Sequence, residues 1–226
     1  MIAEIPEWEA KFWSYIGSGN GKHCPLVDEC QVKNEDGMCL DNLKERISRL
    51  LGAKRFTLRD YGFIRCQTCG RMYELVEKLA LQYLRKGRVH YPPVPTDLIS
   101  VIDGQHDIEI RPVPLKAYHG AIWQLQDGWV IHLNANDTNE RKRFTLFHEA
   151  FHILAHRKAT PVFNKRGGTE GSFNETMADC FATCILMPEA WVRKMWVEVK
   201  DLDRMAEIFE VPIQVACVRL KWLGLL

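Results

Sequence analysis

The sequence predicts an α+β fold in which a short group of strands comes before a run of helices. Ile108, Ile110 and Val113 alternate with polar residues, and residues 117–125 and 129–134 are rich in aromatic and β-branched residues, as in strands. From about residue 139 onward, apolar residues recur every three or four positions, which is typical of helices. Because strands and helices do not alternate along the chain, a parallel sheet built from βαβ units is not expected.

The composition is that of an ordinary globular protein and excludes several classes. Of 226 residues, 46% are hydrophobic, and 30 Lys and Arg stand against 29 Asp and Glu. This balance argues against a disordered chain and against a general nucleic-acid binder. No apolar run approaches the roughly 20 residues of a membrane span, and the acidic start of the chain does not resemble a signal peptide. We therefore expect a cytoplasmic protein that does not enter a membrane.

The first 90 residues are predicted to be mainly helical. Helices are expected at residues 4–16, 41–51 and 72–85 from the spacing of their apolar residues. The proline-rich run 91–95 then interrupts the chain. We expect it to separate a small cysteine-rich region, residues 1–90, from a second domain, residues 91–226.

Five cysteines characterise the first region: Cys24, Cys30, Cys39, Cys66 and Cys69. In the cytoplasm they are expected to be thiols or metal ligands, because disulfides are reduced there. Cys66 and Cys69 have the C-x-x-C spacing with which two thiolates of one turn bind one metal. With two of the other three they would form a second zinc site. An iron–sulfur cluster on four of the five is the rival, and unligated thiols are the remaining alternative. We expect this region to sense a signal or dock a partner.

The second region begins with a short helix and continues into strands. Thr96 can cap a helix that reaches about residue 103, and Ile108, Ile110 and Val113 alternate as in a strand. Two further strands, 117–125 and 129–134, are joined by the turn sequence Gln-Asp-Gly and predict a hairpin. Helices are then expected at 139–157, 173–187, 189–199, 201–209 and 213–222. The last two resemble a helix-turn-helix, for which a packing role or protein docking is favoured over DNA reading.

The pentapeptide His148-Glu149-Ala150-Phe151-His152 predicts a catalytic zinc site. Residues four apart lie on one helix face, so both imidazoles can reach one ion, and Glu149 can point at a metal-bound water. Zinc lowers the pKa of that water, and the carboxylate takes its proton as a carbonyl is attacked. The apolar flanks of the motif indicate that this helix is buried.

A third protein ligand is required, and Glu175 on the following helix is the candidate. His156 lies about 12 Å along the axis from His148, too far to share a tetrahedral ion. We interpret His156 as a residue that supports the site. Asp179, one turn after Glu175, could accept the second imidazole N–H of a zinc-bound histidine.

Several motifs follow one another in a fixed order along residues 92–226. They are Val130-Ile131-His132-Leu133-Asn134, Arg143-Phe144-Thr145-Leu146-Phe147-His148-Glu149-x-x-His152, Glu175-x-x-Ala178-x-x-Phe181-Ala182, Leu186-Met187-Pro188, Arg219-Leu220 and Leu223-Gly224. Together they resemble the ImmA/IrrE family of zinc peptidases. The resemblance implies a zincin-like, gluzincin-type core with a helix-turn-helix-like tail. It also implies zinc held by His148, His152 and Glu175, with Glu149 as the general base.

The same resemblance implies a biological role. The expected activity is narrow-specificity cleavage of a helix-turn-helix repressor, which releases a stress, phage or mobile-element response. The alternative is a metal-binding transcriptional regulator, or a protein-binding module, with little or no peptidase activity. The sequence departs from the family pattern at Phe151, where glycine is common, at Asp179, where asparagine is frequent, and in its cysteine-rich start.

Overall fold

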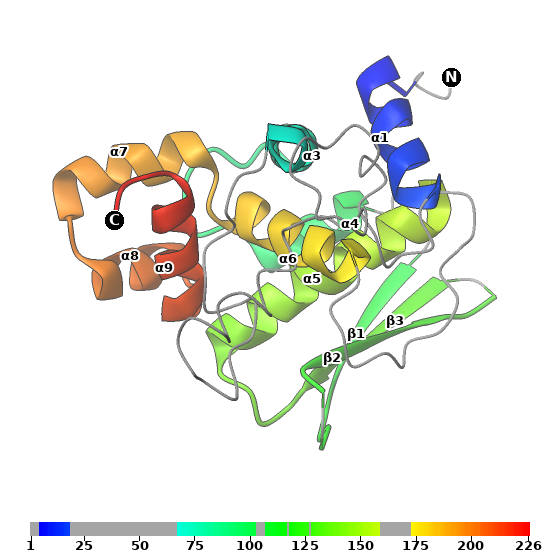
Figure 1. Ribbon diagram of the computed structural model, residues 1–226. Helices are drawn as coiled ribbons and strands as arrows, with labels where there is room; N and C mark the ends of the chain where they lie inside the picture. The colour runs from blue at the N-terminus through cyan, green and yellow to red at the C-terminus, as the bar shows by residue number, and fades with distance from the viewer. Residues whose placement is uncertain (1–4, 19–66, 103–106, 117, 127, 159–172) are drawn as a thin grey trace, which may run out of the picture.

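The computed structural model describes residues 5–18, 67–102, 107–116, 118–126, 128–158 and 173–226. Its helices gather around one face of a small sheet (Figure 1), which confirms the predicted α+β class. The described elements up to residue 134 are α1 (Glu7–Ser18), α3 (Gln67–Lys86), the 3-10 helix η3 (Thr96–Leu98), α4 (Ile99–Ile102), β1 (Asp107–Val113), β2 (Gly120–Gln124) and β3 (Gly128–Asn134). They are followed by α5 (Asn139–Lys158), α6 (Phe173–Leu186), α7 (Glu189–Val199), α8 (Leu202–Phe209) and α9 (Ile213–Trp222). The helix expected at 41–51 lies outside the described residues.

The sheet has the strand order β1-β3-β2. β2 and β3 pair antiparallel, as the predicted hairpin requires, while β1 pairs parallel to β3. The central strand β3 supplies Trp129, Ile131 and Leu133 to the core, because alternate side chains of a strand share one face. β2 is therefore an edge strand, and one of its sides is not used by the described strands.

The active helix α5 lies between the sheet and α6 (Figure 1). Its apolar residues are buried nearly all round the helix, as predicted: Phe144, Leu146, Phe147, Phe151, Ile153 and Leu154 are at most 5% exposed. A helix enclosed in this way is fixed by packing rather than by intrinsic propensity.

Helices from before residue 90 share this core. On α1, Phe12 and Trp13 place their ring centroids 6.4 Å and 5.8 Å from that of Phe151. On α3, Tyr83 meets Phe181 of α6 edge to face at 6.4 Å. α1 and α3 thus pack on α5 and α6, and the division of the chain near residue 90 stays a prediction.

The C-terminal helices are tied to α3 by a buried ion pair. Arg219 is 1% exposed, and its guanidinium contacts the Glu77 carboxylate of α3 at 2.5 Å. The same guanidinium donates to the carbonyl of Met187 at 2.9 Å and lies 4.7 Å from the Trp222 ring centroid. Glu77 also accepts from the backbone N–H of Glu189 at 3.0 Å, which caps the start of α7.

The hairpin of α8 and α9 has the boundaries expected from sequence. Asp201 caps α8 by accepting from the N–H of Arg204 at 2.7 Å, and Glu210 ends the helix in the left-handed region with φ of 48°. Arg143 of α5 donates to the carbonyls of Glu210 and Val94, which joins this turn to the active helix. None of the described helices combines the length and the apolar run of a membrane span.

Candidate metal centre

Two histidines of α5 form the base of the site. His148 and His152 are one turn apart, and their Nε2 atoms lie 3.1 Å from each other. The two residues are only 8% and 6% exposed. The i, i+4 spacing and the burial of α5 therefore aim both imidazoles at one point, as the sequence predicts.

Glu175 completes the cluster from α6, the helix that packs alongside α5. Its Oε2 lies 3.2 Å from Nε2 of His148, and its Oε1 lies 3.3 Å from Nε2 of His152. The side chain of Glu175 is 51% exposed, so the cluster is closed on the protein side and accessible on the carboxylate side. The ligand atoms of all three residues fall within 4.8 Å of one another.

The spacing of these atoms fits one metal ion. Zinc bonds to nitrogen and oxygen are about 2.0–2.2 Å, so the ligands of a tetrahedral ion are about 3.3 Å apart. The Nε2 atoms of the two histidines are 3.1 Å apart, and each lies 3.2 or 3.3 Å from a different oxygen of the Glu175 carboxylate, which is close to that value. Two imidazoles and one carboxylate also leave the fourth position that a catalytic zinc needs.

Asp179 supports the first histidine. Its Oδ1 lies 2.8 Å from Nδ1 of His148, one helical turn after Glu175 on α6. Such a carboxylate fixes the ring orientation and directs Nε2 toward the metal. The predicted contact between Asp179 and a ligand histidine is present in the structure.

The carboxylates also set the charge of the metal-free cluster. Burial alone would lower the pKa of His148, but the hydrogen bonds with Asp179 and Glu175 raise it to about 10. Burial opposes ionisation of Glu175, yet its hydrogen bonds with His148 and His152 hold its pKa well below the ordinary value. The metal-free site therefore carries a proton on His148 at neutral pH, which a metal ion must displace.

Glu149 lies against the edge strand β2. It is 5% exposed, and its carboxylate borders the backbone of Gly120. Thr145, one turn earlier on α5, borders the same glycine and is also 5% exposed. The sequence reading missed Gly120, although a glycine within a strand often marks a close approach of another group.

The remaining predicted site residues are placed only in part. α5 continues through His156 to Lys158, so His156 lies two turns beyond His148, and its side chain is outside the described residues. Cys24, Cys30, Cys39 and Cys66 also lie outside them. Cys69 falls in the first turn of α3, but its side chain is not described. The second metal site therefore stays a prediction.

Cys180 and Cys184 are core residues on α6. Both are fully buried, with their sulfur atoms 3.9 Å apart. Burial, together with the neighbouring Cys180, raises the pKa of the Cys184 thiol well above its ordinary value. This agrees with the interpretation of these cysteines as small core side chains.

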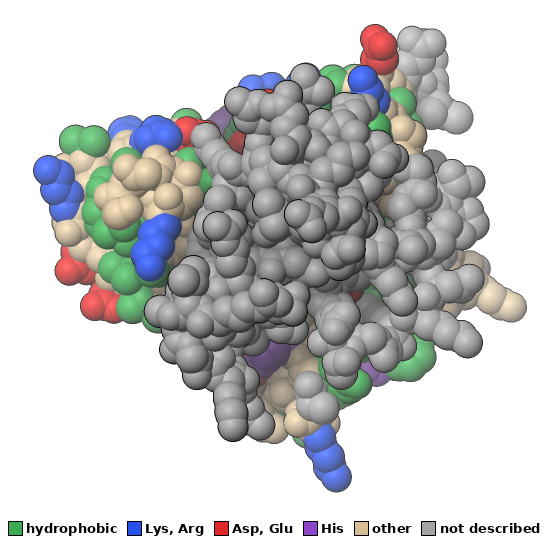
Figure 2. Space-filling view, viewed as in Figure 1, with side chains coloured by type: hydrophobic (Ala, Val, Ile, Leu, Met, Phe, Trp, Pro, Cys, Tyr) green, Lys and Arg blue, Asp and Glu red, His purple; other side chains and the backbone are tan. Residues whose placement is uncertain are grey.

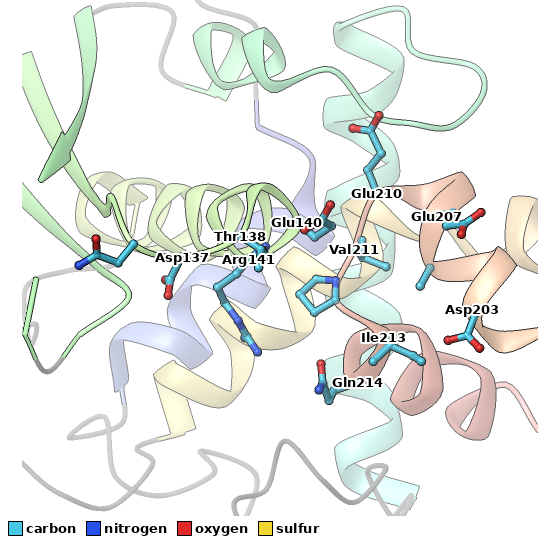
Figure 3. A pocket seen from close by; sticks show the side chains of 13 residues that line it. Asp137, Thr138, Glu140, Arg141, Asp203, Glu207, Glu210, Val211, Ile213 and Gln214 are labelled. Atoms are coloured by element: carbon cyan, nitrogen blue, oxygen red, sulfur yellow. Dashed lines mark hydrogen bonds between the residues drawn. The ribbon is translucent and has the colours of Figure 1, made fainter. Parts of the chain in front are cut away.

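A separate pocket of about 710 Å³ lies between the start of α5 and the α8–α9 hairpin (Figure 3). It contains none of the metal-site residues, and five of its lining residues are acidic: Asp137, Glu140, Asp203, Glu207 and Glu210. On the face shown in Figure 2, both basic and acidic side chains appear on the lobe of C-terminal helices. A DNA-reading hairpin carries basic residues for phosphate contact, so this charge distribution does not favour DNA binding.

Comparison with solved structures gives a similarity in fold. A structure described as a Mycobacterium tuberculosis transcriptional regulator is 12% identical, with a TM-score of 0.50 over 65% of this chain and 46% of that one. The chain thus spans about half the length of that protein. None of the curated proteins matches the chain.

A family model identifies the domain that contains the metal cluster. The model of the IrrE N-terminal-like domain, Peptidase M78, matches residues 103–221. The matched segment contains the sheet, α5 with both histidines, and α6 with Glu175. The cluster therefore lies in a metallopeptidase-like domain, and the chain belongs to the IrrE N-terminal-like family, Peptidase M78.

Proposed function

We propose that this protein is a zinc-dependent endopeptidase of narrow specificity. The observation that carries the proposal is the cluster of His148, His152 and Glu175, with Glu149 on the same helix as the two histidines and its carboxylate against the edge strand β2. When bound, zinc supplies a Lewis acid that polarises a carbonyl and lowers the pKa of water. The family supports peptide hydrolysis as the reaction class.

Three elements of the protein have separate roles around that ion: Glu149, Asp179 and the strand β2. Glu149 accepts the proton of the attacking water and passes it to the leaving amine. Asp179 holds His148 through Nδ1 and keeps Nε2 free for the metal. The side of β2 that none of the described strands pairs with offers main-chain groups to which an extended peptide can add as a further strand.

We propose a DNA-binding repressor of the helix-turn-helix type as the substrate. The support is the order of motifs that this chain shares with the ImmA/IrrE family. In the same proposal, the cysteine-rich start senses the signal for cleavage through a second zinc or an iron–sulfur cluster. The alternative, a regulator with little or no peptidase activity, predicts metal binding without hydrolysis.

The test compares the zinc-loaded wild type with Glu149→Gln. A degenerate peptide library, read by mass spectrometry, reports cleavage, and elemental analysis reports zinc. We expect about one zinc bound in this domain by both proteins, and a rate at least about 100-fold lower for the variant. Glu140→Gln, on the first turn of the same helix, is the matched control and should cleave like the wild type. Equal product patterns from wild type and Glu149→Gln would rule out the proposed mechanism.

The substrate is identified by a second experiment. Wild type and Glu149→Gln are each incubated with a cell extract, and new protein N-termini are labelled and sequenced. New termini within a helix-turn-helix protein, present with wild type alone, are expected. If the new termini are spread over many unrelated proteins, narrow specificity is wrong.

A further inference from the structure

The edge strand β2 comes unusually close to the active helix at Gly120. A Cβ atom built on this glycine would lie 2.4 Å from Cγ2 of Thr145. It would also lie 3.0 Å from Oε1 and 3.3 Å from Cγ of Glu149. The first distance is shorter than real Cβ contacts allow, and the other two are tighter than most. Any side chain here would therefore displace Thr145, Glu149 or the strand.

The backbone conformation of Gly120 does not itself require glycine. Among the glycines that the structure describes, positive φ is found at Gly224 and not at Gly120. Gly120 is paired within β2, opposite Leu133 of β3. Glycine weakens strands because it has high conformational freedom and no side chain to pack. The close approach of Thr145 and Glu149 accounts for its presence.

We infer that Gly120 is a positioning residue for Glu149. This rests on the proposed function, in which Glu149 is the base. The missing side chain lets β2 lie close enough to border the Glu149 carboxylate, which is 5% exposed. The strand thereby limits the rotation of that carboxylate, and Thr145 fills the adjacent space. A base held between a helix and a strand keeps its place relative to the ligands His148 and His152 on the same helix.

Gly120→Ala tests the inference because it introduces only the Cβ atom. Displacing a carboxylate by a few tenths of an ångström in an active site reduces the reaction rate more than it reduces substrate binding. We expect kcat to fall by about tenfold or more, with KM changed by less than about twofold. Zinc affinity should stay within about twofold, because Gly120 does not border His148, His152 or Glu175 in its nearest contacts.

A double-mutant cycle with Glu149→Gln separates positioning from general damage to the fold. The substrate is the library peptide that the wild type cleaves fastest. If Gly120 acts through the Glu149 carboxylate, Gly120→Ala should change the residual rate of Glu149→Gln by less than about twofold. Rate losses that multiply in the double variant would overturn the inference.

Binding of acetohydroxamate to the zinc-loaded protein gives a readout that needs no turnover. A hydroxamate chelates zinc through two oxygens, and its acidic proton is taken by the neighbouring carboxylate. By calorimetry, Gly120→Ala should weaken acetohydroxamate binding about fivefold or more, and should have no effect in the Glu149→Gln background. An equal weakening in both backgrounds would contradict the inference.

Thr145→Ser supplies a matched variant, because it removes the Cγ2 atom nearest to the new Cβ. Of the three close contacts of the new Cβ, the double variant Gly120→Ala/Thr145→Ser keeps the two with Glu149. If Gly120→Ala alone does not fold, this double variant takes its place in both assays. Full recovery of kcat and acetohydroxamate affinity in that double variant would assign the effect to Thr145 and overturn the inference. Absence of any cleavage by the wild type would refute the proposed function, and acetohydroxamate binding would still decide the role of Gly120.

Discussion

Phe151 gives the sharpest test of the packing around the active helix. It lies on α5 next to the ligand residue His152, and its side chain is fully buried. Its ring centroid lies 6.4 Å from that of Phe12, 5.8 Å from that of Trp13 and 5.7 Å from that of Phe181. The large side chain therefore fills the space between α5, the N-terminal helix α1 and α6.

Phe151→Ala should lower the free energy of unfolding by about 3–5 kcal/mol, because a buried ring is lost and the surrounding helices cannot fully close the cavity. Such a loss is a large part of the roughly 5–15 kcal/mol of a typical protein. Urea unfolding of the metal-free protein, followed by circular dichroism and tryptophan fluorescence, measures it. Phe151→Leu is the control and should lose clearly less, because it keeps most of the apolar volume.

A cycle with Trp13→Ala then assigns part of the loss to α1. Aromatic pairs contribute about 0.5–1.5 kcal/mol beyond burial. The sum of the two single-variant losses in unfolding free energy should therefore exceed the loss in the double variant by about 0.5–1.5 kcal/mol. A loss below about 1.5 kcal/mol for Phe151→Ala would refute the reasoning on burial. Strict additivity of the two changes would show that Trp13 of α1 does not stabilise the active helix through Phe151.

Four further predictions concern the metal site and the C-terminal helices. Asp179→Ala should weaken zinc binding about 10- to 100-fold, measured by competition with a chromophoric chelator, whereas Asp179→Asn keeps an acceptor for His148 and should lose much less. Because the pKa of His148 is raised to about 10 and zinc binds the neutral ring, zinc affinity should rise about tenfold per pH unit from pH 7 to 9. The raised pKa of His148 also stabilises the metal-free fold, and this stabilisation is complete below about pH 6.5 and is lost as the pH rises through about 10. The urea midpoint of the metal-free protein should therefore fall over that pH range. A midpoint that does not change with pH would contradict the His148 assignment. Arg219→Met should lower the free energy of unfolding in urea by about 3–5 kcal/mol, because it leaves the Glu77 carboxylate without its cation. Adding Glu77→Gln to the same chain should restore part of the loss. If it restores none, the two residues are not energetically linked.

The local features of the site follow from sequence spacing. The positions of His148 and His152 on a helix determine that both rings face one point. Glu175 and Asp179 are one turn apart on the next helix. The sequence could therefore predict that Glu175 joins the metal cluster and that Asp179 contacts a ligand histidine. Periodicity alone also places α5 through α9 to within a residue or two.

The remaining features depend on contacts between distant parts of the chain. Nothing in the spacing of β1 indicates that it pairs parallel to β3 while β2 lies on the other side. Arg219 and Glu77 form a pair although they are 142 positions apart in the chain. The sequence around either residue does not indicate which residue it pairs with. A glycine within a strand, such as Gly120, indicates that another group comes close to it. The sequence does not indicate that this group is Glu149, which only the fold shows.

The three metal-binding side chains come from two consecutive helices, α5 and α6, within a stretch of about 28 residues. An ion bound to all three closes that stretch into a loop, much as a covalent bridge does. The chain-entropy relation for a bridge across a loop of this length corresponds to about 3.5 kcal/mol of lost freedom in the unfolded chain. Metal bound at this site would therefore also act as a reversible cross-link between α5 and α6, and the protein's resistance to unfolding would then depend on the supply of metal.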